Sequence, residues 1–584
     1  MKTPNSLPAL TLLLPTLLTA ALLLPFSSAL PAAAANGSKP NDAKIAVLVN
    51  QVGYDSTSCK ILVVQVRDPQ SATPAAFQLV AGSGRVMFHD RVIARGRIHA
   101  GTSNDWGAAY WTGDFTGFTK PGRYHAVVQV GEEKVVSFPF EIGKHELFRI
   151  TAEKAARFFY WQRCGFAIPG IHPACHLDDG RLADELGGGH LDATGGWHDA
   201  GDYNKYNGYT PLSVYALAMF AHDPARLLTA RARHRILEES RWGADWLLKM
   251  WRRGQGLLYG NVFSGYRYWG TPDKETDNVK GTSDDRPIHG QGPNAMAAAA
   301  FAALAVASGE PQYREAAEDL WRGGADAKQF DGALLVADLE MDKLTGQPRY
   351  RENARHCVEA LLNAQNANGL WPVHIVEFGV APAALALFAK AHPDDPATRK
   401  ITVALKRWLE RHLRQSDDPF QITPWSEGVF FQPYQNAEST YGGQNSQYLS
   451  QAWALYLASG LLKDPRARSL ADRQMDWVLG LNPFSVCMME GAGSFHLPTY
   501  HHCYTGRTSH KQPGIPGQER GAIPGAIPNG LCRPQGALDK PWGDFVGNDY
   551  HSNEPWLPHN AFYILAINAR AGKSRAAGQR LESL

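Results

Sequence analysis

The chain has 584 residues, which is too long for one ordinary domain, so we expect two or three domains with large buried cores. Its charge is nearly balanced, with 58 basic against 56 acidic residues. This balance gives no electrostatic case for binding nucleic acid.

The first 35 residues are typical of an export signal. Lys2 supplies a positive start, residues 10–26 form an apolar run, and residues 32–35 form a small-residue cleavage site. Two prolines interrupt the apolar run and argue against a spanning helix, although a retained membrane anchor is the alternative. We therefore expect a secreted or periplasmic protein, followed by a polar linker at 36–43.

Residues 44–143 are predicted to form a β-sandwich of the immunoglobulin type. Short runs rich in β-branched residues alternate with turn signals such as Pro121-Gly122. After that turn, apolar side chains alternate with a period of two, at Tyr124, Ala126, Val128 and Val130. About a hundred residues of such strands match the length of an immunoglobulin-like sandwich.

From residue 144 to residue 575 the hydrophobic period becomes helical. Pro311, Pro348 and Pro465 each open an amphipathic segment. Recurring helical hairpins can form a bundle, a solenoid or a closed toroid, and loops of very unequal length favour the toroid. Long loops at one end of a toroid would build the walls of an active site; the candidates are the helix-poor stretches 255–290, 416–443 and 481–556.

The segment GGWHDAGDYNKY at 195–206 carries the clearest chemical signal. It places Asp199 and Asp202 three positions apart around Gly201. Hydrolysis of a glycosidic bond needs one carboxylate to activate water and another acid to protonate the leaving oxygen. A single turn can aim both side chains at one place, because a glycine lets the backbone fold tightly.

Further motifs surround this segment in a fixed order along the chain. They are VNQVGY at 49–54, YWQRCG at 160–165, PACHLDDG at 173–180, LGLNPFSV at 479–486, PGAIPNG at 524–530 and NDYHSNEPWLPHNA at 548–561. In these motifs the chain resembles glycoside hydrolase family 9, the inverting cellulases, in the branch with an N-terminal immunoglobulin-like domain. The resemblance covers nearly everything after the signal. It implies an immunoglobulin-like sandwich followed by an (α/α)6 barrel, with a β-1,4-glucan as substrate.

The resemblance also assigns roles to three carboxylates. Asp202 would be the general base that activates water, Asp199 would help to hold that water, and Glu554 would be the general acid. The acid and base of an inverting enzyme stand roughly 6.5–9.5 Å apart, so two aspartates on one turn are too close to be that pair. Apolar neighbours of Glu554 would raise its pKa. The alternative is that Asp199 caps a helix and Glu554 is a solvated loop acid.

Four potential metal ligands lie near this turn: Cys164, Cys175, His176 and His198. Two thiolates and two imidazoles are the ligand set of a closed structural zinc site, and the resemblance implies zinc here. A buried thiol pair or a disulfide between the two cysteines is the alternative. Because His198 adjoins Asp199, the metal would hold the catalytic turn rather than take part in chemistry.

Calcium and one disulfide are further open questions. Calcium is common in the family, but its ligands stay unassigned, with Asp178-Asp179 and Asp284-Asp285 as the candidates. Cys503 and Cys532 bracket a loop and are candidates for a disulfide after export.

Four residues are expected to bind substrate: Trp269, His501, His502 and Arg507. Trp269 resembles the aromatic cleft loop of the family. The family has a His-His-Arg cluster where this chain has His501-His502-Cys503, and Arg507 follows four positions later. Either Arg507 occupies the same place as the family arginine, or the subsite has lost its guanidinium, which weakens the case for plain cellulose. Shorter glucans, mixed-linkage glucan and an amino sugar stay open.

The leading hypothesis is a secreted, monomeric endoglucanase without a dockerin-type scaffold partner. An exo-acting enzyme that releases glucosyl or glucosaminyl units is the main alternative, and it would need a cleft blocked by loop 255–290 or 500–535. A sugar epimerase on a similar toroid would instead need catalytic histidines. An inactive glycan-binding protein would not need to keep all three carboxylates.

Overall fold

A computed structural model describes most of the chain after residue 42. The described residues are 43–67, 73–74, 76–82, 91–100 (backbone only), 106–169, 172–222, 227–265, 268–270, 278–373, 377–434, 444–497, 500–503, 523–534, 539–544 and 549–572. The predicted signal and nearly all of the predicted linker lie outside them. Among the helices described, none combines the length and the apolar character needed to cross a bilayer.

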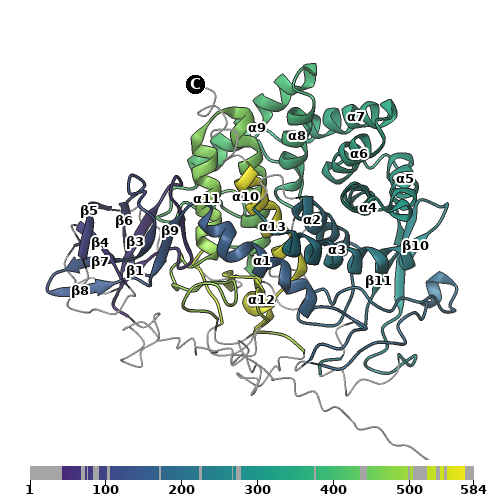
Figure 1. Ribbon diagram of the computed structural model, residues 1–584, viewed down its shortest axis with the longest axis horizontal. Helices are drawn as coiled ribbons and strands as arrows, with labels where there is room; N and C mark the ends of the chain where they lie inside the picture. The colour runs from purple at the N-terminus through teal and green to yellow at the C-terminus, as the bar shows by residue number, and fades with distance from the viewer. Residues whose placement is uncertain are drawn as a thin grey trace, which may run out of the picture.

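The first part of the described chain is a β-sandwich that lies to one side of the helical part (Figure 1). Its strands follow one hydrogen-bonded path: β1 (Ile45–Leu48), β3 (Ile61–Val66), β6 (Ala109–Asp114), β5 (Arg91–Ala100), β4 (Ala76–Ala81), β7 (Gly122–Val130), β9 (Phe140–Gly143) and β2 (Gly53–Asp55), with β8 (Glu133–Val136) beside β7. Strand β5 links the two layers, because it pairs first with β4 and then with β6. Tyr54 packs edge-on against Phe115 and Phe140 in the core.

The helical part forms a double ring (Figure 1). The inner ring consists of α2 (Thr210–His222), α4 (Ala295–Ser308), α6 (Gly332–Thr345), α8 (Val380–Ala391), α10 (Gln444–Leu462) and α13 (Leu557–Gly572). Each of these packs on the next, and α13 packs on α2, which closes the ring. The outer ring consists of α1 (Glu146–Trp161), α3 (Ala230–Met250), α5 (Pro311–Asp326), α7 (Pro348–Ala364), α9 (Pro396–Gln415) and α11 (Pro465–Val478).

Composition explains which helices lie inside. Helices α2 and α4 are apolar on almost every face and are buried all round, as a helix surrounded by protein must be. Helices α5, α7 and α9 carry one apolar stripe and many charges, so they face solvent on one side. Each of these three begins with a proline in its first turn, where the missing N–H costs nothing.

The order of the helices brings the candidate active-site residues together. The Asp199–Asp202 turn precedes α2, and Glu554 precedes α13. These two helices pack on each other where the inner ring closes, and the first residue of α13, Leu557, is hydrogen-bonded to Asp199. The long connections hold only short elements: η3 (Asp184–Leu186), β10 (Trp251–Arg252), β11 (Leu257–Val262), β12 (Ile288–Gly292), β13 (Pro433–Tyr434), β14 (Arg533–Pro534) and α12 (Tyr550–Asn553).

Buried polar contacts join the sandwich to the helical rings. Arg570 on α13 forms ion pairs with Asp55 of the sandwich and with Asp472 on α11, the latter at 2.9 Å. Asn50 of the sandwich donates to Asp476 on α11 at 2.7 Å. These groups are buried, so the two parts pack as one unit rather than swing freely.

We expect Arg570→Met to destabilise the whole protein. The change leaves the carboxylates of Asp55 and Asp472 buried without their cation, and breaking a buried pair in this way typically costs about 3–5 kcal/mol. Thermal unfolding would measure the loss. Arg466→Met is the matched control, because Arg466 pairs with Asp464 and Glu410 at the surface and exposed pairs contribute about 0–1 kcal/mol. Equal melting temperatures for the two variants would show that the domain interface contributes little.

Candidate active site

The turn at 195–206 is held by hydrogen bonds to its backbone on either side of Asp199. Gln162, at the end of α1, donates to the carbonyl oxygens of His198 at 3.1 Å and Ala200 at 2.6 Å. At the other side, the backbone N–H of Leu557 at the start of α13 donates to the carbonyl of Asp199 at 2.9 Å. The turn is therefore fixed between an outer helix and an inner helix.

Asp199 is buried against Trp556. One carboxylate oxygen, Oδ2, accepts a hydrogen bond from Trp556 Nε1 at 2.6 Å. The other oxygen, Oδ1, has no donor among the described residues. Burial and then the charge of Asp202 raise the pKa of Asp199 well above its ordinary value. Asp199 thus keeps one oxygen available to accept a hydrogen bond.

Asp202 accepts two hydrogen bonds from a single residue, Asn204. The Asn204 backbone N–H donates to Oδ1 at 3.0 Å, and its amide nitrogen donates to Oδ2 at 2.9 Å. Burial raises the pKa of Asp202 to about 6, while the bonds from Asn204 and the charge of Arg286 act to lower it. The hydrogen bonds from Asn204 and the charge of Arg286 therefore favour the ionised form of this carboxyl against the effect of burial.

Glu554 reaches the same turn from the segment between α12 and α13. Its Oε1 accepts a hydrogen bond from the backbone N–H of Gly201 at 3.1 Å. Burial and then the charge of Asp202 raise the pKa of Glu554 well above its ordinary value, which favours the protonated form. The three carboxyl groups are thus brought together, and their environments separate a proton acceptor from a proton donor.

Gly201 is required for a reason that differs from the one expected. A Cβ atom at this position would lie 1.9 Å from the carbonyl oxygen of His501. The backbone N–H of Cys503 also donates to the carbonyl of Gly201 at 2.6 Å. The glycine therefore permits close approach of the 500–503 segment rather than a tight local turn.

Cys164, Cys175, His176 and His198 form a compact buried cluster, with one ligand atom of each within 4.8 Å of the others. Cys164 Sγ lies 3.6 Å from His176 Nδ1, and Cys175 Sγ lies 3.6 Å from His198 Nε2. The two ring nitrogens are 3.4 Å apart. Tetrahedral zinc–sulfur and zinc–nitrogen bonds of about 2.3 and 2.0–2.1 Å give roughly 3.5–3.6 Å between S and N, and 3.3–3.4 Å between nitrogens. The cluster fits such a metal site.

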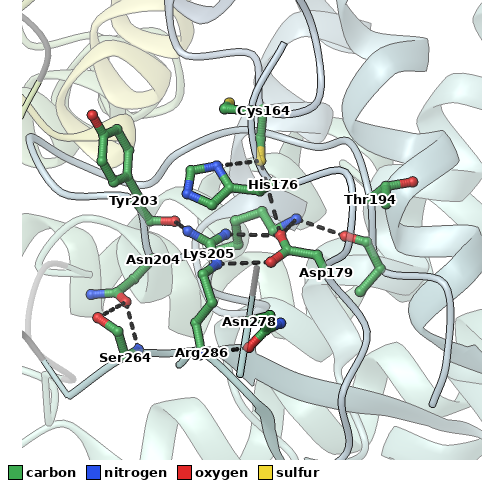
Figure 2. Close-up of polar contacts among 12 residues, drawn as sticks. Cys164, His176, Asp179, Thr194, Tyr203, Asn204, Lys205, Ser264, Asn278 and Arg286 are labelled. Carbon is green, nitrogen blue, oxygen red and sulfur yellow. Dashed lines mark hydrogen bonds and ion pairs between the residues drawn. The ribbon is translucent and has the colours of Figure 1, made fainter. Parts of the chain in front are cut away.

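A second buried network lies beside this cluster (Figure 2). Asp179 pairs with Lys205 at 2.6 Å and with Arg286 at 2.9 Å. Arg286 also donates to the backbone carbonyl of Tyr203, the residue after Asp202. The ring of Tyr203 packs on His176 and His198, with centroids 5.0 and 4.9 Å apart. The metal cluster and the Asp202 turn are therefore mechanically connected.

Comparison with known families settles the relationship. The profile of Glycosyl hydrolase family 9 matches residues 148–567, and that of the Cellulase N-terminal ig-like domain matches residues 42–134. The chain belongs to glycosyl hydrolase family 9. Both halves of the predicted resemblance are thereby confirmed, and this family 9 protein is a glycoside hydrolase of the cellulase type.

Curated relatives of this family 9 protein act on β-glucans. A xyloglucan-specific endo-β-1,4-glucanase of Bacteroides ovatus is 24% identical over 90% of this chain and 93% of that protein. A cellodextrinase of Butyrivibrio fibrisolvens is 29% identical, but the match spans only 37% of this chain and 39% of that protein.

Solved structures agree with the fold. A metagenome-derived family 9 endoglucanase superposes with a TM-score of 0.67 at 25% identity, over 90% of this chain and 99% of that one. A zinc-binding triple mutant of the family 9 endoglucanase J30 superposes with a TM-score of 0.66 at 21% identity, over 89% of this chain and 99% of that one. At 21% identity, the similarity to the J30 mutant concerns the fold alone.

The structure brings two of the four predicted substrate-binding residues together. The rings of Trp269 and His501 lie 4.0 Å apart between centroids, tilted by 45°. His502 has a different place from the one expected, because its ring is fully buried and Nε2 contacts Gln162 Oε1 at 2.9 Å. It supports the residue that holds the Asp199 turn. Arg507 lies outside the described residues.

The cysteines considered for disulfides are free thiols, and two of the aspartates considered for calcium form ion pairs. Cys503 and Cys532 are both buried free thiols, and Cys164 and Cys175 are also free thiols. One member of each acidic pair considered for calcium is engaged by a cationic side chain: Asp179, as above, and Asp285, which pairs with Arg181 at 2.7 Å. The calcium ligands stay unassigned.

Several supporting residues were not singled out from the sequence. Trp556 and Gln162 lie inside motifs that were recognised, but each contacts a residue of another motif. Asn204 contacts Asp202 within its own motif and Ser264, which lies in none of the motifs. Arg286 had no local signal at all, because its partner Asp179 is far away in the sequence.

Proposed function

We propose that this family 9 protein is an exported endoglucanase that hydrolyses internal β-1,4-glucan bonds with inversion of configuration. One observation carries the proposal: Asp202 and Glu554 meet at one turn, where hydrogen bonds from Asn204 favour the ionised form of Asp202 and burial favours the protonated form of Glu554. An inverting glycosidase needs that division of protonation states. The signal-like first 35 residues support export.

The proposed reaction uses the chain's own carboxylates. Asp202 accepts a proton from a water molecule, and Asp199 accepts a hydrogen bond from the same water through Oδ1. The activated water attacks the anomeric carbon from the face opposite the leaving sugar. Glu554 gives its proton to the glycosidic oxygen as that bond breaks. The product therefore begins as the α-anomer.

Zinc is the proposed occupant of the Cys164, Cys175, His176 and His198 cluster. The Cys2His2 donor set and the spacing of the ligand atoms support this metal. Although burial opposes it, a hydrogen bond from Cys175 and the charges of Lys205 and the histidines hold the pKa of Cys164 well below its ordinary value. The zinc would be structural, because all four positions are protein ligands.

The proposal is tested by the anomeric form of the first product. Proton NMR of freshly cleaved cello-oligosaccharide or xyloglucan oligosaccharide is expected to show the α-anomer before mutarotation. A β-anomer would mean retaining chemistry and would overturn the assigned roles. Product lengths from cellohexaose and from chitosan oligomers separate endo action from the alternative, exo-acting release of glucosyl or glucosaminyl units from chain ends.

A further inference from the structure

The side chain of Asn204 lies between the Asp202 carboxylate and the backbone that follows strand β11. Its amide nitrogen donates to Asp202 Oδ2 at 2.9 Å. Its amide oxygen accepts from the backbone N–H of Ser264 at 3.0 Å, and the Ser264 hydroxyl is 3.4 Å away (Figure 2). Asn204 is only 2% exposed, so its amide has no solvent to exchange these partners with.

The chemistry of these partners decides which way the amide points. A backbone N–H can only donate, so the oxygen of the amide must face Ser264. The NH2 group must then face Asp202, and it can donate only to an acceptor. A carboxylate satisfies this requirement, because an ionised carboxyl group only accepts hydrogen bonds. Reversing the amide would leave two mismatched pairs in a buried place.

Ser264 is itself fixed relative to the catalytic turn. The end of β11 is bonded to the turn in both directions: Lys205 N–H donates to the carbonyl of Val262 at 3.0 Å, and Val262 N–H donates to the carbonyl of Lys205 at 2.9 Å. Lys205 is in turn anchored by its ion pair with Asp179. The strand therefore presents the Ser264 N–H at a defined place beside Asn204.

We propose that Asn204 is a positioning residue, oriented by the Ser264 backbone, that holds the Asp202 carboxylate ionised and aimed for its role as general base. The inference rests on the proposed function. According to this inference, β11 and Ser264 favour the ionised form of Asp202 by orienting the Asn204 amide, although both are remote from Asp202 in the sequence. The hydrogen bond from the Asn204 amide to a neutral Asp202 carboxyl group would be weaker, because hydrogen bonds to a charged acceptor are stronger.

The charges around Asp202 agree with this role. Asp199 and Glu554 approach from the same turn and from the segment before α13, and Asp202 interacts electrostatically with both. Burial also disfavours ionisation of Asp202. Against these stand the hydrogen bonds from Asn204 and the positive charge of Arg286, which precedes β12. Removing the amide donor should therefore raise the pKa of the base.

The experiment compares Asn204→Asp with the wild type on a β-cellobioside that carries a fluoride or dinitrophenyl leaving group. Such a leaving group needs no protonation, so the pH profile reports the base alone. The Asp variant keeps an acceptor for Ser264 and removes the donor, but it also adds a carboxylate whose charge raises the pKa of Asp202 by itself. We expect the acid limb of kcat to move upward by about one pH unit, which is a roughly tenfold loss of rate below the limb. The KM should change little. Asn204→Ala removes the donor without adding charge, so it should move the limb in the same direction by less, and its shift carries the test.

Asn353→Asp is the matched control. Asn353 on α7 donates to the buried carboxylate of Asp338 at 3.0 Å, so the change removes the same kind of donor far from the catalytic turn. It should lower the melting temperature and leave the acid limb in place. An unmoved limb in both Asn204 variants, or an equal shift in the control, would overturn the inference while the proposed function stands.

Failure of the proposed function would be recognised separately. It would appear as a wild type that cleaves neither activated nor natural β-1,4-linked substrates. The role of Asn204 would then be read from the Asp202 carboxyl resonance in protein labelled with 13C at aspartate carboxyl carbons, assigned with Asp202→Asn. A higher pKa in Asn204→Ala than in the wild type supports the inference, and an unchanged pKa overturns it.

Discussion

Glu554→Gln should abolish hydrolysis of natural β-1,4-glucans while leaving measurable activity on substrates with an activated aryl leaving group. Glutamine cannot donate a proton to the departing sugar oxygen, whereas a good leaving group departs without one. Asp202→Asn should lose both activities, because no group then activates water. General acid–base catalysis of this kind contributes about 10²–10⁴-fold for each group. Initial rates on cellohexaose and on a dinitrophenyl cellobioside measure the contrast.

The pH dependence of the wild type follows from the same two groups. Asp202 must be deprotonated, and burial raises its pKa to about 6, so the rate on natural glucan should rise as the pH increases through this value. Glu554 must be protonated, and burial raises its pKa well above the ordinary range, so the rate should fall only at higher pH. The alkaline limb should disappear in Glu554→Gln assayed on the activated substrate.

A control variant separates these effects from a general disturbance of the turn. Asp192→Asn makes the same chemical change at an exposed carboxylate that pairs with Lys249 and touches none of the catalytic carboxylates. It should keep wild-type rates on both substrates. If Asp202→Asn behaved like Asp192→Asn, Asp202 would not be the base.

Cys175→Ser should release the proposed zinc and lower both stability and turnover. Loss of an outer-sphere partner costs about 10–100-fold in metal affinity, and loss of a thiolate ligand should cost more. Because metal binding contributes directly to folding free energy, the melting temperature should fall. Turnover should fall as well, since His198 is bonded next to Asp199. Elemental analysis, thermal unfolding and initial rates measure the three effects.

Cys357→Ser is the comparison for this variant. Cys357 is another buried thiol, on α7, and its neighbour is the Asp338 carboxylate at 3.4 Å rather than the cluster. It should lose some stability and keep its metal content. Purified wild type that contains no zinc would dispose of the zinc assignment, whatever the variants do.

The candidate catalytic residues could be predicted from the sequence because they lie in short local motifs. Asp199, Asp202 and the four metal-ligand candidates lie in short motifs that follow one another, so their order along the chain was enough to recognise the family. Glu554 was predicted from its motif before α13, and the structure places it against Gly201. The roles of these residues stay predictions until the variants are measured.

Predictions of the substrate-binding side chains depended on more than local pattern. His501 and His502 are adjacent in the sequence, yet one ring meets Trp269 and the other is fully buried against Gln162. Sequence order cannot separate two neighbouring histidines, because the direction of each side chain is decided by the α1 terminus and the 268–270 segment that pack around them. The same limit applied to Asp179, whose partners Lys205 and Arg286 come from separate parts of the chain.

The sequence by itself determined the family, the order of a sandwich and a helical part, and the identity of the ionisable residues near position 200. Hydrophobic period and motif order are properties of the sequence, so they can be recognised without a three-dimensional structure. Tertiary structure alone decided the direction of the pKa shift of Asp202 and which residues support the site. Closing the inner ring brings α2 and α13 together, so that burial and mutual charge act on Asp202 and Glu554. Likewise, the pairing of β11 with Lys205 places the Ser264 N–H beside Asn204. Sequence analysis could not predict this contact, because a backbone donor has no sequence signature.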